Sequence, residues 1–488
     1  MKLMKFSLSK LFLVLVFMGS LLLLLRPIGD PDFWWHLKTG KMIVETKSIP
    51  IYDDYAFTYT GTPWKAPEWL TEVFMYSLFK LGGVRLVILI FSLLSIAAII
   101  VAGLRAQKDR NPYWLGFALL LGVILSTPVL WARPQVFLIL YASIFVFLLE
   151  KYVQKRNLRY LIPLPIIMLL WVNQHGSFIL GIGIIGVFLL ASWIDGYSEF
   201  KKTNKSLKRV VFNRISLTLV TIIALCLLVA LINPSGIKMF LYPFQTMSEP
   251  AQQEYIIEWA SPNFHERTWV PLAIMFLALI AFGLRSRNRT STSNILLCVG
   301  FGYLTLLSSR FSALYAIVSI PILTDLLTDT MPFRWSGKPN SKIIIPISVL
   351  LLTIVITYAI LLLIGLEKKQ SEFDESRYPI SAVTFIKERE IQGRIFNSYN
   401  WGGYLIWSMY PENKIYIDGR ADVFGTDRIR RFVDIYTTKP GWSSALVADN
   451  IDYVLIEPNT YLAYALKDST NWKCIYEDPV SVFFQYSP

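Results

Sequence analysis

The chain has 488 residues, of which 54% are hydrophobic, and its formal net charge is +13 at pH 7. A soluble core cannot bury so much apolar sequence, and the composition therefore indicates a polytopic membrane protein. The basic residues lie in short loops between long apolar runs, which argues against nucleic-acid binding. Cys226 and Cys298 fall inside apolar runs and Cys474 is alone near the C-terminus, so neither a disulfide framework nor a cysteine metal site is expected.

Apolar runs near the length that a helix needs to cross a bilayer recur along the chain, and we expect about eleven transmembrane helices. Leu25-Arg26-Pro27 follows the first run and offers no small-residue cleavage site. This run is therefore expected to be an uncleaved helix rather than a signal peptide. The expected spans are 8–25, 85–104, 113–131, 135–149, 160–173, 177–194, 214–232, 269–284, 293–309, 311–328 and 343–365.

Positive charge is concentrated at the N-terminus and in every second loop between these spans. By the positive-inside rule these segments are cytoplasmic, and the intervening loops lie outside. We therefore expect a multi-pass protein of the plasma (inner) membrane with a cytoplasmic N-terminus and an extracytoplasmic C-terminal domain. The basic residues are Lys2, Lys5, Lys10, Arg105, Lys108, Arg110, Lys151, Lys155, Arg156, Arg159, Lys201, Lys202, Lys205, Lys208, Arg209, Arg285, Arg287, Arg289, Arg334, Lys338 and Lys342.

The first outer loop, residues 26–84, is long enough to form structure of its own. Aromatic residues recur at helical spacing in Phe33–Val44 and Trp64–Phe79, which predicts two helices lying in the membrane interface. For Trp34 and Trp35 taken singly, simple interfacial anchoring is the favoured interpretation.

The tail forms the second candidate domain, and the chain is expected to divide into a transmembrane domain, 1–366, and an α/β domain, 367–488. Strand-like runs at Lys414–Ile417 and Tyr453–Ile456 are separated by Gly and Pro, and a helical stretch covers Ala382–Arg389. A second large outer loop at 233–268 belongs to the transmembrane domain. The fold class is a polytopic α-helical membrane protein with a small C-terminal α/β extracytoplasmic domain.

Acidic residues follow the first span at the point where the chain meets water. The run Asp30-Pro31-Asp32-Phe33-Trp34-Trp35-His36-Leu37 precedes Ile49-Pro50 and Asp53-Asp54. A carboxylate fixed at the membrane surface is suited to chemistry on a lipid-linked substrate. Asp32 is the first candidate for catalysis, and Asp30 is expected to cap the following helix. The next carboxylates are Glu68 and Glu258.

Cationic and polar residues gather in the other outer turns. Arg133, His175 and Arg310 each lie between two expected spans on the outer side. A single arginine at a span end can simply snorkel to the interface. Together the three side chains are better explained as a pocket for the phosphate of a donor, because arginine presents a planar fork of donors. The histidines lack the spacing of a zinc motif, so a zinc site is not favoured.

The segment Asp32-Phe33-Trp34-Trp35-His36-Leu37, followed by Ile49-Pro50, Asp53 and Gly61, resembles the first outer loop of oligosaccharyltransferase catalytic subunits. More broadly, the layout is similar to that of the GT-C membrane glycosyltransferases. The resemblance implies transfer of a sugar from a polyprenyl-phosphate carrier to an extracytoplasmic acceptor. It also implies that Asp32 acts as a base or as the ligand of a divalent cation, Mg²⁺ or Mn²⁺.

Two departures from the family pattern limit the implied acceptor. In the family, a later outer loop carries a second pair of acids, but the corresponding loop here has Arg133 instead. The family's tail motif contains an Asp, which is missing from the loosely similar segment Ser398-Tyr399-Asn400-Trp401-Gly402-Gly403-Tyr404. Protein N-glycosylation is therefore not supported, and a lipid, polysaccharide or O-linked acceptor is as plausible. We interpret 397–404 with 417–422 as a surface recognition loop in which Trp401 and Asp422 bind the acceptor; the alternative is a turn with a structural Asp418–Arg420 pair.

The residues fit this chemistry without the family name. In an inverting transfer, a base deprotonates the acceptor and positive charge stabilises the departing phosphate, roles open to Asp32 and to Arg133 or Arg310. The expected partners are a polyprenyl-phosphate-linked sugar, membrane lipid and an unidentified acceptor. Two alternatives remain, namely a transporter or lipid flippase of envelope precursors and a non-catalytic envelope assembly protein. Neither mid-membrane charges nor a repeat between halves, typical of transporters, is evident.

Overall fold

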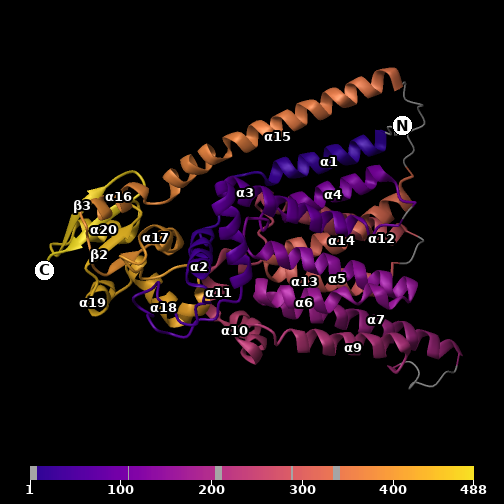
Figure 1. Cartoon of the computed structure of the whole chain (residues 1–488), viewed down its shortest axis with the longest axis horizontal. Helices are drawn as coiled ribbons and strands as arrows, with labels where there is room; N and C mark the ends of the chain where they lie inside the picture. Colours follow the sequence, from indigo (N-terminus) through magenta and orange to yellow (C-terminus); the bar gives the residue numbers. More distant parts are fainter. Residues whose placement is uncertain (1–7, 108, 204–210, 287–289, 333–340) are drawn as a thin grey trace. The chain divides into compact units, whose positions relative to one another are not determined.

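The structure is a computed structural model, and it describes most of the chain (Figure 1). The described residues are 8–107, 109–203, 211–286, 290–332 and 341–488. Several basic residues used above to assign topology lie outside them, namely Lys2, Lys5, Lys108, Lys205, Lys208, Arg209, Arg287, Arg289, Arg334 and Lys338.

The chain folds into two compact units, each built from three separated segments. Unit 1 comprises Met1–Arg26, Ile88–Phe240 and Glu258–Ile364. Unit 2 comprises Pro27–Val87, Leu241–Ile257 and Gly365–Pro488. Unit 2 thus joins the first outer loop, part of the second and the tail, and its last segment begins next to the expected boundary at 366/367.

Unit 1 is a bundle of apolar helices. Within it α14 contacts α4, α12, α13 and α5, and 83% of the apolar stretch of α14 is buried, so this helix forms the centre of the bundle. Only 17% of the corresponding stretch of α12 is buried, as expected for a helix that faces lipid. The bounds are α1 Leu8–Leu24, α4 Pro112–Ser126, α5 Gln135–Lys155, η1 Leu158–Tyr160, α6 Pro163–Gln174, η2 Gly176–Phe178, α7 Ile179–Thr203, α9 Arg214–Val229, η3 Gly236–Phe240, η5 Arg267–Trp269, α12 Val270–Arg285, α13 Thr292–Leu307, η6 Ser309–Phe311 and α14 Ser312–Thr330; η4, Ile257–Trp259, crosses the unit boundary.

Two long helices belong to both units. The first, α3, extends over Trp69–Gly103 and is interrupted at Gly82 and Gly83, where Gly83 has a φ of 64°. This left-handed conformation suits glycine, and it separates the expected interfacial stretch from the expected span 85–104. The second, α15, extends over Ser341–Arg377.

The number of spans is confirmed only in part. Six helices among the described residues are long and apolar enough to cross a membrane. Shorter apolar helices of 10–17 residues occupy five further expected positions, so the structure agrees with the predicted positions of the apolar runs but does not establish eleven crossings. A multi-pass helical membrane protein with a small C-terminal sheet is the architecture observed.

Unit 2 combines short helices with one four-stranded sheet in the order β1-β2-β4-β3. Strand β1 is parallel to β2, with Phe396 opposite Val454, and β4 is antiparallel to both of its neighbours. Phe396, Val454 and Phe484 are buried and form part of the core of unit 2. The bounds are α2 Phe33–Thr46, α10 Tyr242–Ser248, α11 Pro250–Tyr255, α16 Ile380–Glu388, β1 Ile395–Asn397, η7 Tyr399–Trp401, α17 Gly402–Met409, α18 Ala421–Tyr436, α19 Trp442–Ala448, β2 Tyr453–Ile456, α20 Tyr461–Lys467, β3 Trp472–Glu477 and β4 Val482–Tyr486.

The prediction of a strand at Lys414–Ile417 was wrong, whereas those of a strand at Tyr453–Ile456 and of a helix near Ala382–Arg389 are confirmed by β2 and α16. In the first segment only Ile415 makes isolated bridges. The side-chain oxygen of Asn397 accepts the backbone N–H of Tyr416 at 2.8 Å. This bond replaces a ladder partner, so the segment does not extend the sheet.

Two other local predictions need correction. Residues 397–404 are not a surface loop, because they end β1, form η7 and begin α17, and Trp401 is only 2% exposed. Trp34 and Trp35 are both 8% exposed and pack inside unit 2, with Trp34 edge-on to Tyr404 at a centroid distance of 5.9 Å. Their indoles therefore contribute to the core of unit 2 instead of serving only as interfacial anchors.

Candidate functional site

The start of α2 separates the roles of the two acids that precede it. The carboxylate of Asp30 accepts the backbone N–H of Asp32 at 3.0 Å, and Asp30 is 5% exposed. Asp32 stands at the N-cap of α2, but its side chain makes no capping hydrogen bond. Asp30 therefore stabilises the turn that precedes the helix, but it does not occupy the expected N-cap position, which belongs to Asp32.

The carboxylate of Asp32 lies against the turn Asp418-Gly419-Arg420 in the tail. A Cβ atom at Gly419 would lie 1.8 Å from Oδ1 of Asp32. Only a residue without a side chain fits there, so the close approach explains the glycine. The turn and the start of α2 thus fix the position of the Asp32 carboxylate.

Arg420 stabilises this turn through two buried ion pairs. It binds Asp418 at 2.6 Å and Asp53 of the first outer loop at 2.5 Å, and all three side chains are at most 1% exposed. Burial lowers the pKa of Arg420, but Asp418 and Asp53 outweigh this effect and raise it above its usual range. The predicted Asp418–Arg420 pair is present, and the structure adds Asp53 as its third member.

A tyrosine hydroxyl lies among the acids of this turn. Partial burial and then the negative charges of Asp32, Asp418 and Asp422 raise the pKa of Tyr399 well above its usual value. Its hydroxyl oxygen is buried without a hydrogen-bond partner among the described residues, as is the indole nitrogen of Trp35. We name Asp32, Asp418, Asp422 and Tyr399 the acidic cluster. Two buried donors without a partner among the described residues make this region a candidate polar binding site.

A small cavity of about 140 Å³ adjoins this region within unit 2. Trp64, Tyr242, Glu249 and Asp422 are among its lining residues, and the Tyr242 hydroxyl donates to Asp422 at 3.3 Å. Burial, Asp422 and Glu68 together raise the pKa of Tyr242 well above its usual value. Glu68 therefore lies near this cavity.

Glu68 also faces the histidine of the first-loop motif. Nε2 of His36 lies 3.6 Å from Glu68, and Nδ1 lies 3.1 Å from Glu72. His36 and Glu72 are almost fully buried, whereas the Glu68 side chain is 19% exposed. Glu68 is thus the most accessible member of this trio.

The predicted phosphate-binding residues meet in unit 1. Arg133 binds Glu258 at 2.6 Å, and Arg310 lies over the ring of Trp259 with its guanidinium carbon 4.5 Å from the centroid. The hydroxyls of Ser308 and Ser309 donate to the backbone oxygen of Glu258, at 2.9 and 3.1 Å. We name Arg133, His175, Glu258 and Arg310 the arginine cluster.

Charge in the arginine cluster sets the ionisation of its other members. Burial opposes ionisation of Glu258, but Arg133 and Arg310 hold its pKa below the usual range. Burial and then the same two arginines lower the pKa of His175 to about 3. Nδ1 of His175 accepts the backbone N–H of Ser177 at 3.1 Å, which leaves the proton of the neutral ring on Nε2. Two arginines and one glutamate give the cluster a net positive charge.

The structure thus sorts the predicted residues into two groups. Asp32, Glu68 and Asp422 lie in unit 2, and Arg133, His175, Glu258 and Arg310 lie in unit 1. Trp401 belongs to unit 2, but its indole donates to the backbone oxygen of Arg377 at 2.8 Å and does not line the cavity.

Sequence reasoning missed Tyr242, Tyr399 and Gly419. The dipeptide Gly419-Arg420 between two acids was a usable signal, because a glycine there leaves room for a side chain from elsewhere.

The described residues do not form the expected metal site. No group of three His, Cys, Asp or Glu side chains in the described ranges is arranged to hold a metal ion. Asp32 has the acidic turn beside it, but Arg420 already neutralises Asp418. The donor set near Asp32 therefore does not fit a divalent cation.

Comparison with solved structures identifies the fold. The archaeal oligosaccharyltransferase AglB from Archaeoglobus fulgidus, in complex with an inhibitory peptide and a dolichol-phosphate, superposes with a TM-score of 0.56 and 11% identity over 98% of this chain and 74% of its own. An Archaeoglobus fulgidus oligosaccharyltransferase in complex with Zn and sulfate gives a TM-score of 0.56 and 12% identity over 98% of this chain and 73% of its own. ArnT from Cupriavidus metallidurans, bound to undecaprenyl phosphate, gives a TM-score of 0.52 and 14% identity over 98% and 97%.

The chain therefore shares its fold with an oligosaccharyltransferase. This result confirms, for the fold, the predicted resemblance to the GT-C membrane glycosyltransferases. No protein-family model and no curated protein matches the sequence.

Proposed function

We propose that the chain is a membrane glycosyltransferase that moves a sugar from a polyprenyl-phosphate-linked donor to an extracytoplasmic acceptor. The observation that carries the proposal is the arginine cluster, which gathers three phosphate-binding candidates from separate helix ends. Solved structures with the same fold bind dolichol-phosphate and undecaprenyl phosphate, which supports a lipid phosphate as the ligand.

In the proposed donor site, the guanidinium groups of Arg133 and Arg310 bind the phosphate oxygens. Neutral His175 donates from Nε2 without adding charge. Glu258 holds Arg133 in position and stays ionised because both arginines lower its pKa. We propose Glu258 as a reserve catalytic carboxylate only, since its ion pair makes it a poor proton acceptor.

In the proposed chemical step, Asp32 removes the proton of an acceptor hydroxyl. The acceptor oxygen then bonds to the anomeric carbon while the bond from that carbon to the phosphate oxygen breaks. Polyprenyl phosphate leaves with the bonding electron pair, and the two arginines stabilise its new charge. Glu68 is the second candidate for the base, because it is the exposed member of the His36 trio.

The acceptor is proposed to bind beside the acidic cluster. Asp422 lines the small cavity in unit 2 and is available to accept hydrogen bonds from a hydroxylated acceptor. Trp401 is proposed to support this region indirectly, through its bond to the backbone of Arg377. The acceptor class remains a lipid, a polysaccharide or an O-linked residue. The implied Mg²⁺ or Mn²⁺ on Asp32 is not supported by the local donor set, and no step is assigned to it.

The donor site can be tested by titration of purified variants with polyprenyl phosphate in detergent. Arg133→Ala and Arg310→Ala should each weaken binding by about 1.5–3 kcal/mol, the scale of a hydrogen bond to a charged group. Arg267→Ala is the matched control. Arg267 is exposed in η5, and its substitution removes the same charge from unit 1. Unchanged affinity in both cluster variants would show that the two arginines do not bind the phosphate and only extend to the membrane interface.

Transfer itself can be tested in cells. Mass spectrometry of surface glycans and lipid-linked sugars, with and without the gene, should show a lost glycan and an accumulated donor. Identical profiles would contradict the proposed function even if the phosphate binds.

A further inference from the structure

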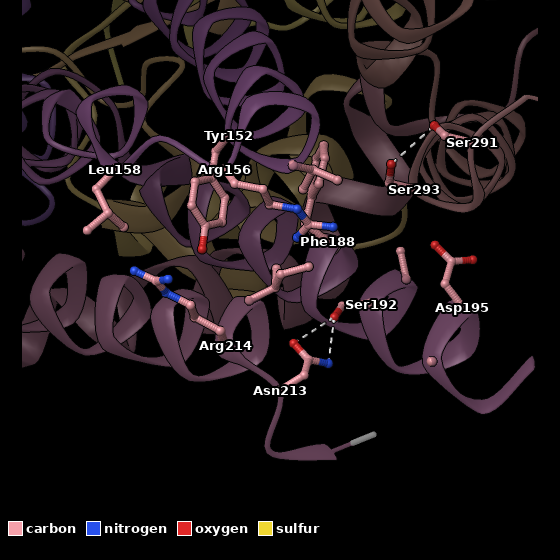
Figure 2. Close-up of a pocket in the computed structure, with 14 residues that line it drawn as sticks. Tyr152, Arg156, Leu158, Phe188, Ser192, Asp195, Asn213, Arg214, Ser291 and Ser293 are labelled. Carbon is pink, nitrogen blue, oxygen red and sulfur yellow. Dashed lines mark hydrogen bonds between the residues drawn. The ribbon is translucent and has the colours of Figure 1, made fainter. Parts of the chain in front are cut away.

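A large cavity opens at the end of the unit 1 bundle where the expected basic loops lie. Its volume is about 720 Å³, within the usual range for small-ligand sites. Its walls come from the end of α5, from α7 and from the first residues of α9 and α13. Figure 2 shows Arg214 toward one side of the cavity, Arg156 reaching toward Phe188 near its middle, and Asp195, Ser291 and Ser293 toward the other side.

Two arginines give the cavity its charge. Arg156 and Arg214 both line it, and both are exposed. Neither guanidinium has a hydrogen-bond or ion-pair partner among the residues that the structure describes. Asp195 is the only carboxylate among the described lining residues, and it is engaged by the hydroxyl of Thr292 at 2.5 Å. The cavity therefore carries cationic groups whose charge the described chain does not neutralise.

The position of Arg214 adds to this imbalance. It is the first residue of α9, directly after the N-cap Asn213, whose side chain accepts the backbone N–H of Ser216 at 2.9 Å. A helix N-terminus carries partial positive charge, so a cation at this position is unfavourable unless an anion lies nearby. The carboxylate of Asp195 lies at the first turn of α13, where it accepts the hydroxyl of Thr292. Among the described residues, no carboxylate makes a comparable contact with the first turn of α9.

The rest of the cavity wall is apolar, and this restricts the class of ligand that can bind. Val153, Leu158, Phe188 and Ile215 also line the cavity, and Phe188 is 2% exposed. A ligand that satisfies both parts of the wall has an anionic head and an apolar portion. Because the cavity lies at the ends of membrane helices, lipid from the adjoining leaflet can supply such a molecule.

We propose that this cavity binds the phosphate headgroup of an anionic phospholipid, with Arg156 and Arg214 on the phosphate oxygens. The first turn of α9 adds backbone N–H groups to the same anion. The glycerol and the start of the acyl chains lie along Phe188 and its apolar neighbours. The site is distinct from the arginine cluster, shares no residue with it, and does not depend on the proposed transferase activity.

The proposal can be tested on the full-length protein in detergent by native mass spectrometry, with phosphatidylglycerol and phosphatidylcholine as the probes. Phosphatidylglycerol should bind more tightly than phosphatidylcholine. Arg156→Gln and Arg214→Gln, which keep most of the side-chain stem, should each weaken phosphatidylglycerol binding by about tenfold, as expected for one hydrogen bond to a charged group. Thermal melting of each variant checks that the fold is retained.

Matched controls separate a built site from general attraction to a basic surface. Lys155→Gln and Arg159→Gln remove the same charge from exposed positions nearby that do not line the cavity, and they should leave binding unchanged. Equal losses in these controls, or no loss in Arg156→Gln and Arg214→Gln, would overturn the proposal. Full competition by inorganic phosphate would also overturn it, because it would show that the site takes free phosphate and does not require the lipid.

Discussion

At the scale of single residues, Asp32 is distinguished from the other acids by what it does not do. Asp30 makes the turn bond into α2, whereas Asp32 makes no capping bond and lies against Gly419. A carboxylate that two segments position, and that does not cap the helix it precedes, is a candidate for chemistry. This contrast gives a pair of neighbouring variants with opposite expectations.

Asp32→Asn should lower glycan transfer by about a hundredfold or more, because the amide cannot accept the acceptor's proton. Stability should change little, since Asn replaces Asp with nearly the same shape and no cap bond is lost. Transfer in membrane vesicles, measured with the lipid-linked donor, reports the first effect and thermal melting the second. Asp30→Asn is the control and should reduce transfer only mildly. Near-normal transfer by Asp32→Asn would move the catalytic assignment to Glu68.

His175 makes a separate prediction about pH. Its pKa is about 3 in the folded protein because burial, Arg310 and Arg133 disfavour a further positive charge, and an unfolded histidine titrates near 6.5. Below pH 6.5 the unfolded state therefore binds the proton more strongly. The folded state should lose about 1.4 kcal/mol per pH unit as the pH falls from about 6.5 toward about 3, and this contribution is fully retained above 6.5.

The measurement is thermal melting of the full-length protein in detergent at neutral and mildly acidic pH. His175→Asn should lower the melting temperature at neutral pH but should flatten the acid dependence relative to the unmodified protein. His265→Asn is the control, because His265 is exposed in the same unit. Identical acid dependence in all three proteins would show that His175 does not couple to folding.

At the scale of elements, the sequence predicts the helices better than the turns. The run 311–328 corresponds to α14, Ser312–Thr330, and the run 135–149 to the start of α5, Gln135–Lys155. Long apolar runs specify a helix almost regardless of context, because the bilayer requires every backbone group to be bonded within the segment. In the tail this requirement is absent, and at Lys414–Ile417 the backbone N–H of Tyr416 binds the side chain of Asn397 where a strand was expected.

The turn at Gly419 carries an element-level prediction. Gly419→Ala places a methyl group 1.8 Å from the present position of Asp32 Oδ1, so the start of α2 and the tail turn must separate. Transfer should fall by about tenfold or more, since small misplacements of a reacting group are costly. Gly365→Ala is the control, because a Cβ there meets nothing within 4 Å. Unchanged transfer by Gly419→Ala in the vesicle assay would contradict the assigned position of the Asp32 carboxylate.

At the scale of the whole molecule, the residues of the candidate site come from segments that no local pattern connects. Asp53 and Arg420 are 367 positions apart yet form a buried ion pair. The first-loop motif and the tail motif were each recognisable in the sequence, but their meeting depends on tertiary packing within unit 2. The likeness of the fold to an oligosaccharyltransferase was predictable because it follows from the layout of spans and loops.

The final prediction concerns the side of the membrane on which the tail lies. Helix α15 has 37 residues and is therefore about 55 Å long, well beyond the thickness of roughly 30 Å of the hydrocarbon core. A helix of this length is long enough to cross the bilayer and extend beyond it, and the positive-inside rule predicts that the tail that follows lies outside. Reporter fusions at Gly441 and at Lys205, which lies outside the described residues, should give opposite signals, with Lys205 cytoplasmic. A fusion at Lys151 should match Lys205 as an internal control. Cytoplasmic signals from both Gly441 and Lys205 would overturn the arrangement, and with it the proposal that the acceptor is extracytoplasmic.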